Sequence, residues 1–578
     1  MYRRRWAPVV AVVAVGAALR LYGIGSESLW TDELITLAFV QSMTAGELLT
    51  TIPRVNPHPP LYYVLLDLWV GAFGTTETAL RLPSTLFGVL SIPALYLLGR
   101  RIGDHTVGLV AALLLALSPF HVRYAQEVRM YALFVFLVVA SFLLVHAVAD
   151  RRSRRPRHRR GLLAAWVLSC LLLVGTHYFG GFVVAAQVTY LVIRLDRVLP
   201  RGVGSFSTRR IQRAYGFATL ASPLFLLALG AVFDLPHYFY IPFPTPRFAA
   251  GTLARFFVGY GTVPLAVSVA VLVLVGTLAT LAAVRFDATT PLDFDSSLRA
   301  TLRRARVDVG DDGLALAAVA FLVPFFGPVL VSYLVVPVFW PRYVIAASVG
   351  LFLLVGLGVR TLPRESLQVA AVALLVVAVV PMTGVYHTTD QKEEWREAGN
   401  VVEENAHSGD LVLLMDRISE YALTYYVDRE DVERGTIVGA SSGTGYDANT
   451  SAEIAEKTVG HDRVWLFLNH GTDEERERVL TAVRGSRTQV FHRQFFQVEL
   501  YLFDRSPDAA SGTDSDSAAS TEPAAGASAS VSTSASASPA TFVADPGVTD
   551  WRWRSVSRTT GGSNAGAESR RHRFAVAD

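Results

Sequence analysis

The segment Trp6–Gly23 (WAPVVAVVAVGAALRLYG) is a nearly unbroken apolar run, and Ser28–Glu33 (SLWTDE) follows it closely. A run of this length can cross a bilayer as a helix. Asp32 and Glu33 therefore lie at the mouth of a predicted membrane helix, where ionisable groups are costly to hold and are functional suspects. A carboxylate pair can take a proton from a hydroxyl or bind a hard cation. The alternative is that both acids simply face water in the headgroup zone.

The composition is that of a membrane protein. The 578 residues are 52% hydrophobic and 17% charged, and the mean hydropathy is +0.37. Apolar runs of about 20 residues recur through the first two thirds of the chain. Arg3–Arg5 before the first run would suit a signal peptide, but the run is long and further spans follow, so we expect a membrane anchor. The single cysteine, Cys170, excludes a disulfide framework and a thiolate metal site within one chain.

Clusters of arginine orient the spans, because short cytoplasmic loops collect basic residues. Placing every cluster inside predicts about eleven spans, a cytoplasmic N-terminus and an extracytoplasmic C-terminal region. The basic run Arg151–Arg160 would also suit nucleic acid, but its place between spans explains it more simply, and no nucleic-acid partner is expected. The predicted spans are Trp6–Gly23, Leu82–Leu98, Ile102–Phe120, Met130–Ala149, Leu162–Tyr178, Phe179–Ile193, Tyr215–Phe233, Val263–Val284, Leu314–Val336, Tyr343–Val359 and Leu367–Val385.

The first external loop, Ile24–Leu80, is predicted to contain helices of its own. Glu33–Thr50 carries apolar residues at helical spacing, which predicts one amphipathic helix on the membrane surface. Asn56–Pro60 (NPHPP) predicts a rigid turn that carries His58. Leu61–Phe73 is apolar but too short to span, which predicts an interfacial or re-entrant helix.

A second external corner, Ser118–Tyr131 (SPFHVRYAQEVRMY), interleaves cations, an acid and aromatic side chains. Arg123 and Arg129 are candidates for gripping a phosphate, because the guanidinium fork matches phosphate oxygens and keeps its charge. Glu127 and Tyr131 are their neighbours in this candidate substrate site. The alternative is interfacial snorkelling within an aromatic belt, which accounts for the tyrosines better than for the charged residues.

Later external corners add further candidates. Arg342, in the segment Trp340–Tyr343, is a second outward-facing arginine that could reach a phosphate. The loop Asp234–Tyr260 could cover a site. His177 also lies at such a corner, where a lone histidine is more often a packing residue than a chemical one.

From Tyr386 onward the sequence changes character. Residues 386–505 contain 23 Asp and Glu against 13 Lys and Arg, and predict a small extracytoplasmic α/β domain after the membrane domain, residues 1–385. No glycine-rich phosphate loop, nucleophile elbow or metal spacing occurs there, which indicates a supporting or recognition role. Residues 506–578 are predicted to be a low-complexity, disordered tail. The domain's predicted helices are Glu393–Ala406 and Glu474–Val483, and its strands are Leu411–Met415, Val464–Leu468 and Gln497–Phe503.

Several motifs occur in a fixed order along the first part of the chain. They are SLWTDE (28–33), HPPLYY (58–63), ALRLPS (79–84), SPFH (118–121) and QEVRMY (126–131). In this order they resemble the GT-C type membrane glycosyltransferases, and among these the family 39 proteins, which are related to dolichyl-phosphate-mannose protein mannosyltransferases and lipid A aminoarabinose transferases. The resemblance covers residues 1–385 and implies a polytopic α-helical membrane fold.

The resemblance implies an inverting transfer of a sugar from a polyprenyl-phosphate donor, such as dolichyl-phosphate mannose, to a hydroxyl acceptor outside the membrane. By the matching acidic pair, Asp32 would be the base, and Glu33 would position the acceptor or a cation. The phosphate would be held by Arg123, Arg129 and Arg342, and His58 would orient Asp32 or the donor. The pair would also suit Mg²⁺ or Mn²⁺, so metal dependence stays open, and no other cofactor is expected.

A transporter and a structural anchor are the alternatives to a transferase. A transporter or flippase of a lipid-linked precursor would place its binding groups near the membrane midplane on broken helices, whereas here the charges cluster at the predicted outer mouths. A structural anchor would need one span. The sequence does not choose between mannose, another hexose and a pentose, or between a protein, a glycan and a lipid as acceptor. The acidic, lysine-poor domain is typical of a high-salt microbe and favours a surface glycoprotein's glycan.

Overall fold

The computed structural model describes residues 2–56, 58–150, 156–194, 241–261, 263–286, 305–307, 312–416, 418–437, 449–469 and 471–505. The described chain forms two compact units. The first contains the described residues up to Glu27 and those of Thr36–Gln391, and the second contains Ser28–Ile35 together with those from Lys392 to Arg505.

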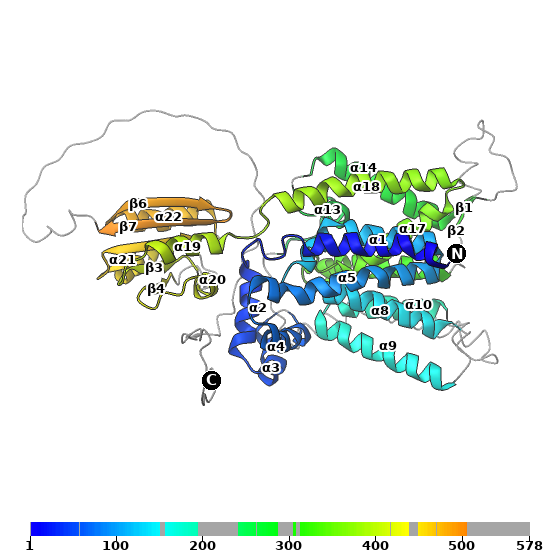
Figure 1. Ribbon diagram of the computed structural model, residues 1–578, viewed down its shortest axis with the longest axis horizontal. Helices are drawn as coiled ribbons and strands as arrows, with labels where there is room; N and C mark the ends of the chain where they lie inside the picture. Colours follow the sequence, from blue (N-terminus) through cyan, green and yellow to red (C-terminus); the bar gives the residue numbers. More distant parts are fainter. Residues whose placement is uncertain are drawn as a thin grey trace, which may run out of the picture. The chain divides into compact units, whose positions relative to one another are not determined.

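The first unit is a bundle of helices (Figure 1). Helix α2 (Thr31–Ser42) begins with residues of the second unit and continues into the first. A short antiparallel pair, β1 (Val284–Phe286) and β2 (Ala305–Val307), is the one sheet among the described residues of this unit. The remaining helices are α1 (Tyr2–Leu21), α3 (Ala45–Val55), α4 (Leu61–Phe73), α5 (Glu77–Ile102), α6 (His105–Leu117), α7 (Pro119–Ala125), α8 (Tyr131–Ala149), α9 (Pro156–Thr176), α10 (Gly180–Ile193), α13 (Pro246–Val258), α14 (Leu265–Ala283), α16 (Asp312–Leu334), α17 (Ala346–Thr361) and α18 (Glu365–Thr388).

The predicted spans correspond closely to these helices. Each span other than Tyr215–Phe233 contains a helix, and Tyr215–Phe233 lies outside the described residues. Within the described chain, five helices (α5, α8, α14, α16 and α18) are long and apolar enough to cross a membrane, and the bent pair α6–α7 would make a sixth. Other apolar helices, among them α9, α10 and α17, are shorter. The chain is therefore built as a multi-pass membrane protein, while the full number of spans and the side on which each terminus lies stay predictions.

Helix α17 forms the centre of the bundle. All its residues from Ala346 to Val359 are buried. A Cβ at Gly350 would overlap the backbone of Phe321 in α16, and a Cβ at Gly358 would overlap the carbonyl of Leu278 in α14. Small residues thus let the helix backbones approach closely, which is how helices pack in a bilayer, where apolar side chains gain little by leaving lipid.

The predicted span Ile102–Phe120 is interrupted near its end. The chain bends by 63° between α6 and α7, and Ser118 caps the start of α7 with its side chain. The buried guanidinium of Arg20 donates to the carbonyls of Leu115 at 2.8 Å and Ala116 at 3.0 Å. The last carbonyls of a helix lack partners within it, so Arg20 stabilises the end of α6 where the chain turns into the corner that carries Arg123 and Glu127.

The prediction of one continuous helix over Glu33–Thr50 is wrong. Helix α2 ends at Ser42, and α3 begins at Ala45. Thr44 and Glu47 form a capping box, in which the Glu47 N–H donates to Thr44 Oγ1 at 3.3 Å and the Thr44 N–H donates to the Glu47 carboxylate at 2.8 Å. This pairing satisfies the N–H groups of a helix start, so it favours a new helix here. Helix α4, in contrast, has the predicted bounds, Leu61–Phe73.

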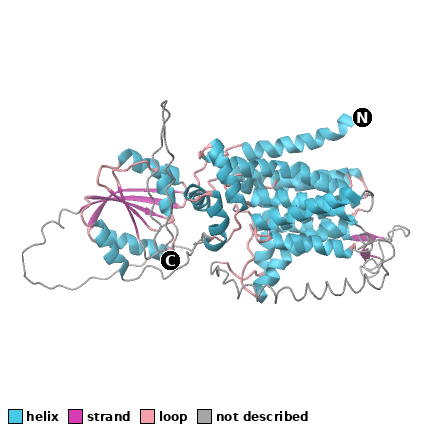
Figure 2. Cartoon of the chain, turned by 90° about the horizontal axis from the view of Figure 1, so that it is seen from below, coloured by secondary structure: helices cyan, strands magenta, loops and turns pink. Residues whose placement is uncertain are grey.

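The second unit contains a five-stranded sheet with helices on both faces (Figure 2). The strand order is β4-β3-β5-β7-β6. Strand β3 pairs in parallel with β4 and β5, whereas β7 pairs antiparallel with β5 and β6. The elements are α19 (Trp395–Asn405), β3 (Leu411–Leu414), α20 (Ser419–Tyr426), β4 (Glu433–Thr436), α21 (Asn449–Thr458), β5 (Arg463–Leu468), α22 (Asp473–Arg484), β6 (Arg487–Phe495) and β7 (Val498–Arg505).

Successive side chains of β5 point to opposite faces of the sheet, so this unit has a packed layer on each face. Leu466 packs in a cluster with Ile454 of α21 and Val479 of α22. Phe467 points to the other face and stacks on Trp395 of α19, with ring centroids 5.8 Å apart. The predicted small α/β domain is therefore present, although the sequence analysis missed α20, α21, β4 and β6. The low-complexity tail lies outside the described residues.

Candidate functional site

The acidic pair lies in the first turn of α2 and belongs to the second unit. Asp32 is 4% exposed and Glu33 is fully buried. The Lys392 ammonium donates to Glu33 Oε2 at 3.2 Å, and both side chains are buried. The backbone N–H of Trp30 also donates to the Glu33 carboxylate, at 3.3 Å. A buried charge is tolerated when a counter-charge and hydrogen bonds accompany it, and Glu33 has both.

The start of α2 is held by a second carboxylate, Glu393. Its Oε2 accepts from the Thr31 N–H at 3.1 Å, from Thr31 Oγ1 at 2.6 Å and from the Trp395 indole at 2.6 Å. The first N–H groups of a helix have no partner within it, and negative charge is favourable at this end of the helix dipole. Glu393 therefore acts as a capping group supplied by a distant part of the chain.

A metal ion would have a small set of ligands here. Among the described residues there is no group of three or more His, Cys, Asp or Glu side chains placed to hold one. Asp32 and Glu33 would supply two carboxylates, of which Glu33 already pairs with Lys392. Mg²⁺ can be held by one or two carboxylates together with waters and substrate phosphates, so the involvement of Mg²⁺ or Mn²⁺ stays a prediction.

The first unit holds a largely buried group that we call the histidine–arginine cluster, in which Arg342 is partly exposed. It consists of His58, Arg129, Tyr131, His177, Arg342 and Tyr343. The His58 ring lies 5.5 Å from His177 and 6.0 Å from Tyr343 between centroids, and Tyr131 lies 5.8 Å from His177. The Arg342 guanidinium lies 5.6 Å from the centre of the Tyr343 ring. The fold thus gathers residues from four separate parts of the sequence.

Positive charge dominates this cluster. Burial lowers the pKa of His58 well below its usual range, and the cations of Arg129 and Arg342 lower it further. His58 is therefore neutral, because a third charge beside two guanidinium groups in a buried place would be costly. Arg129 is 2% exposed and donates to Thr36 Oγ1 at 2.9 Å. Thr36 lies in α2, the helix whose first turn carries the acidic pair.

His177 supplies a hydrogen-bond donor whose direction can be assigned. Its Nδ1 accepts from the Phe179 N–H at 3.1 Å, so the proton of the neutral ring lies on Nε2. Among the described residues, no polar partner lies within hydrogen-bonding distance of His177 Nε2 or of His58 Nδ1, and both atoms are buried. Buried polar atoms are normally satisfied, so the unsatisfied Nε2–H of His177, in a cluster with two arginines, is a donor suited to an anionic group.

Arg123 and Glu127 form a separate pair. Arg123 Nε donates to Glu127 Oε1 at 2.9 Å, and the Arg123 guanidinium lies 4.9 Å from the centre of the Tyr260 ring. Tyr260 shares a 2.7 Å hydrogen bond with Tyr124, and Tyr124 packs edge-on against Tyr131 at 4.8 Å. Glu127 thus neutralises Arg123, and the pair supports the histidine–arginine cluster through aromatic contacts.

The structure brings together some predicted site residues and adds others. His58, Arg129, Tyr131 and Arg342 meet in one cluster, whereas Asp32 and Glu33 belong to the other unit. From the sequence, His177 is predicted to be a packing residue, and Tyr343, Lys392 and Glu393 carry no motif that marks them as site residues. The SLWTDE motif does not indicate that Lys392 is the partner of Glu33, because these two residues are 359 positions apart in the sequence.

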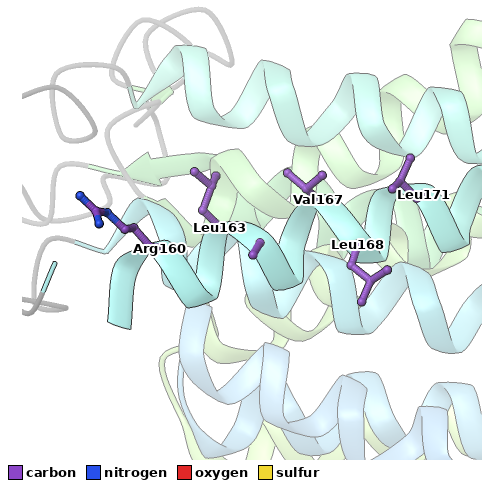
Figure 3. A pocket seen from close by; sticks show the side chains of 6 residues that line it. Arg160, Leu163, Val167, Leu168 and Leu171 are labelled. Carbon is purple, nitrogen blue, oxygen red and sulfur yellow. The ribbon is translucent and has the colours of Figure 1, made fainter. Parts of the chain in front are cut away.

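A hollow of about 520 Å³ lies along α9 and contains no predicted site residue. Figure 3 shows its lining side chains, which come from successive turns of this one helix. Leu168 and Leu171 are more than half exposed, as expected of a helix face that contacts lipid. The lining residues are Arg160, Leu163, Ala164, Val167, Leu168 and Leu171.

Comparison with known proteins begins with a family model. Residues 57–202 match the model described as Dolichyl-phosphate-mannose-protein mannosyltransferase. This range includes the residues from His58 to His177 in the cluster, as well as Arg123 and Glu127, but it excludes Asp32, Glu33 and Arg342. No curated protein matches the sequence.

Solved structures give a second comparison. ArnT from Cupriavidus metallidurans in the apo state is 12% identical, with a TM-score of 0.50, and the match covers 87% of this chain and 98% of ArnT. ArnT bound to undecaprenyl phosphate is 11% identical, with a TM-score of 0.49 and coverage of 86% and 98%. The Archaeoglobus fulgidus oligosaccharyltransferase complex with Zn and sulfate is 12% identical, with a TM-score of 0.45 and coverage of 86% and 72%. The match to ArnT in the apo state shows that the chain shares its fold. Together with the family model over residues 57–202, it bears out the predicted resemblance to GT-C type membrane glycosyltransferases.

Proposed function

We propose that this chain, which shares the fold of ArnT, is an inverting glycosyltransferase. It would move a sugar, mannose or another hexose, from a polyprenyl-phosphate donor to a hydroxyl acceptor outside the membrane, on a protein or its glycan at the cell surface. The observation that carries the proposal is the histidine–arginine cluster, a buried, cationic group with unsatisfied ring nitrogens. Most of the cluster falls in the range that matches the mannosyltransferase family model.

The cluster suits the leaving group of such a reaction. When the bond between the sugar and the lipid phosphate breaks, the phosphate gains negative charge. Fixed cations and donors aimed at that charge stabilise the transition state, and in a site without water they are worth more than in solution. Arg129 and Arg342 supply fixed charge, and His177 supplies a neutral N–H donor. Arg123 has a lesser part, since Glu127 already pairs with it.

Asp32 supplies the proton acceptor in this proposal. The acceptor hydroxyl gives its proton to the Asp32 carboxylate while its oxygen forms a bond to the anomeric carbon. The bond from that carbon to the phosphate oxygen breaks, and its electron pair leaves with the lipid phosphate. A single displacement of this kind inverts the anomeric centre. Glu33 positions the acceptor or a cation, and His58 and Tyr131 line the donor's site.

In this proposal the donor lies in the bilayer and the acceptor lies at its outer face. A polyprenyl donor stays in the bilayer, so membrane lipids surround the helical unit and the exposed apolar face of α9. Positive-inside placement puts the N-terminus in the cytoplasm and the C-terminal domain outside. An acceptor on a secreted protein, a growing glycan or a lipid would then meet the donor at the outer face.

The test is mass spectrometry of surface glycoproteins and lipid-linked glycans in cells that carry the wild-type chain, no chain, or Asp32→Asn. Asp428→Asn, an exposed aspartate of the second unit, is the matched control. The proposal expects deletion and Asp32→Asn to remove the same sugar, and the control to keep it. If deletion changes the glycans and Asp32→Asn does not, the chain serves glycosylation as a carrier, as a flippase would.

A further inference from the structure

The C-terminal domain holds the segment Ser28–Ile35, which carries the acidic pair and which we call the acidic segment, through a set of hydrogen bonds. The side chain of Glu397 accepts from Ser28 Oγ at 2.8 Å. Glu393 accepts from both the N–H and the hydroxyl of Thr31, and Lys392 donates to Glu33. Three residues in and just before the first turn of α19 thus bind three residues in and before the first turn of α2, all within one compact unit.

The same stretch is anchored to the core of the domain. The Glu394 N–H donates to the carbonyl of Phe496 at 3.2 Å, and the Phe496 N–H donates to the Glu394 carboxylate at 2.6 Å. Phe496 lies in the tight turn between β6 and β7, next to Gln497, whose φ is 61°. Trp395 is buried against Phe467 of the sheet. The position of the acidic segment is therefore set by the folded domain.

We propose that Lys392 and Glu393 are positioning residues, through which the C-terminal domain fixes the acidic pair for catalysis. The catalytic part of this proposal rests on the proposed function, in which Asp32 is the base. Lys392 holds Glu33 by charge, and Glu393 fixes the first turn of α2. Together they set the direction of Asp32, which lies between Thr31 and Glu33.

The identity of Lys392 supports this role. The chain contains only two lysines, Lys392 and Lys457. Lys457 forms a partly exposed pair with Glu453 four residues earlier on the same helix, a kind of contact that contributes little. Lys392 is buried, and its ammonium donates to Glu33 Oε2. An ammonium is a compact charge on a flexible stem, and here it lies beside a buried carboxylate in a chain whose other cations are nearly all arginines.

The kinetic test compares Lys392→Met, Lys392→Arg and the control Lys457→Met in the full chain. A misplacement of about 1 Å can cost about 100-fold in rate. We therefore expect Lys392→Met to lower kcat by about 10- to 100-fold. KM for the donor should change little. Lys392→Arg keeps the charge and should lose less, and Lys457→Met should match wild type. Equal kcat for the two methionine variants would overturn the proposal.

A second comparison separates positioning from general damage. If Lys392 acts through Glu33, the double variant Glu33→Gln with Lys392→Met should be no slower than Glu33→Gln alone. A double variant that loses the product of the two single effects would overturn the proposal, because Lys392 would then act independently of Glu33.

Amide hydrogen exchange tests the contact without relying on transferase activity. Lys392→Met and Glu393→Gln should speed exchange in the segment Ser28–Ile35 by 10-fold or more, about the scale expected when an anchoring bond of a local unit is lost, while β5 and β7 stay protected. Unchanged exchange in that segment would overturn the inference. If Asp32→Asn keeps full transfer, the proposed function fails instead, and the exchange result still decides whether Lys392 holds the segment.

Discussion

The histidine–arginine cluster and the acidic segment are both buried and charged, yet they are built in opposite ways. In the cluster, ring nitrogens of His58 and His177 have no protein partner among the described residues. In the acidic segment, Glu33 is paired with Lys392, and Glu393 receives three hydrogen bonds. The two regions thus differ in whether these particular buried polar atoms have protein partners among the described residues.

This difference indicates two separate tasks. An anion-binding place must leave donors free for the incoming group, because a donor already used by the protein would have to be released first. A general base must be correctly oriented before the reaction begins, and a fixed framework of hydrogen bonds maintains that orientation. In the proposed function, the cluster would bind the phosphate, and the hydrogen-bonded segment would orient Asp32.

Of the changes considered, removing a positive charge from the cluster should lower kcat the most. Arg129→Ala and Arg342→Ala each remove a cation aimed at the proposed phosphate, and loss of one electrostatic group at a transition state costs about 10²-fold or more in kcat. The measurement is kcat and KM with a polyprenyl-phosphate sugar. Arg429→Ala, which breaks a partly exposed pair with Asp431, serves as control. Arginine variants that behave like this control would show that the cluster does not carry the phosphate.

Removing the His177 donor should have a smaller effect. His177→Phe keeps an aromatic ring against Phe134, which stacks on His177 at 5.1 Å, but it removes the Nε2–H. One neutral hydrogen bond contributes about 1 kcal/mol, so we expect kcat/KM for the donor to fall by about 5- to 10-fold. His177→Gln retains an N–H donor and should lose less. Equal losses in the two variants would assign His177 to packing.

The neutral state of His58 predicts a pH dependence of stability. Burial, and then the cation of Arg129, hold the pKa of His58 well below its usual range. In the unfolded chain a histidine takes up a proton below about pH 6.5. The unfolded state thus binds more protons than the folded state in this window, and the contribution of His58 makes stability fall as pH drops below about 6.5.

His58→Asn removes that contribution, so this variant should lose less Tm than wild type between about pH 7 and about pH 5. His492→Asn, at an exposed position, is the control. The measurement is thermal unfolding of the purified chain in detergent. If His58→Asn and wild type lose Tm in parallel, His58 takes up a proton in the folded state as readily as in the unfolded state. The positive charge that Arg129 and Arg342 place around His58 would then be weaker than described.

The capping box at α3 should give the smallest effect. Thr44→Ala removes the side chain that accepts from Glu47, and loss of such a cap costs about 1 kcal/mol. We expect a small fall in Tm with kcat unchanged, because Thr44 belongs to neither charged region. A tenfold loss of kcat, measured beside Tm, would mean that the break between α2 and α3 helps to place the site.

Much of this architecture was readable in the sequence. Hydropathy predicted spans that each contain a helix wherever the structure describes them, and the bounds of α4 were predicted as Leu61–Phe73. The break at Thr44 was missed although Thr44 and Glu47 have the spacing of a capping box, because apolar periodicity was followed across it. Lys392 and His177 could not be assigned from local patterns. Their roles arise from contacts between distant segments, and a lone histidine or lysine has the same local appearance whether it packs or binds.

The most direct test of the central claim is the stereochemistry of transfer by the purified full chain. A polyprenyl-phosphate sugar of known anomeric configuration is supplied with a hydroxyl acceptor, and the product is analysed by NMR for wild type and for Asp32→Asn. The account predicts a product of inverted configuration with wild type, and a rate lower by about 10²-fold or more with Asp32→Asn, since the base is lost and the side-chain size is kept. A retained configuration, or an Asp32→Asn variant as fast as wild type, would contradict it.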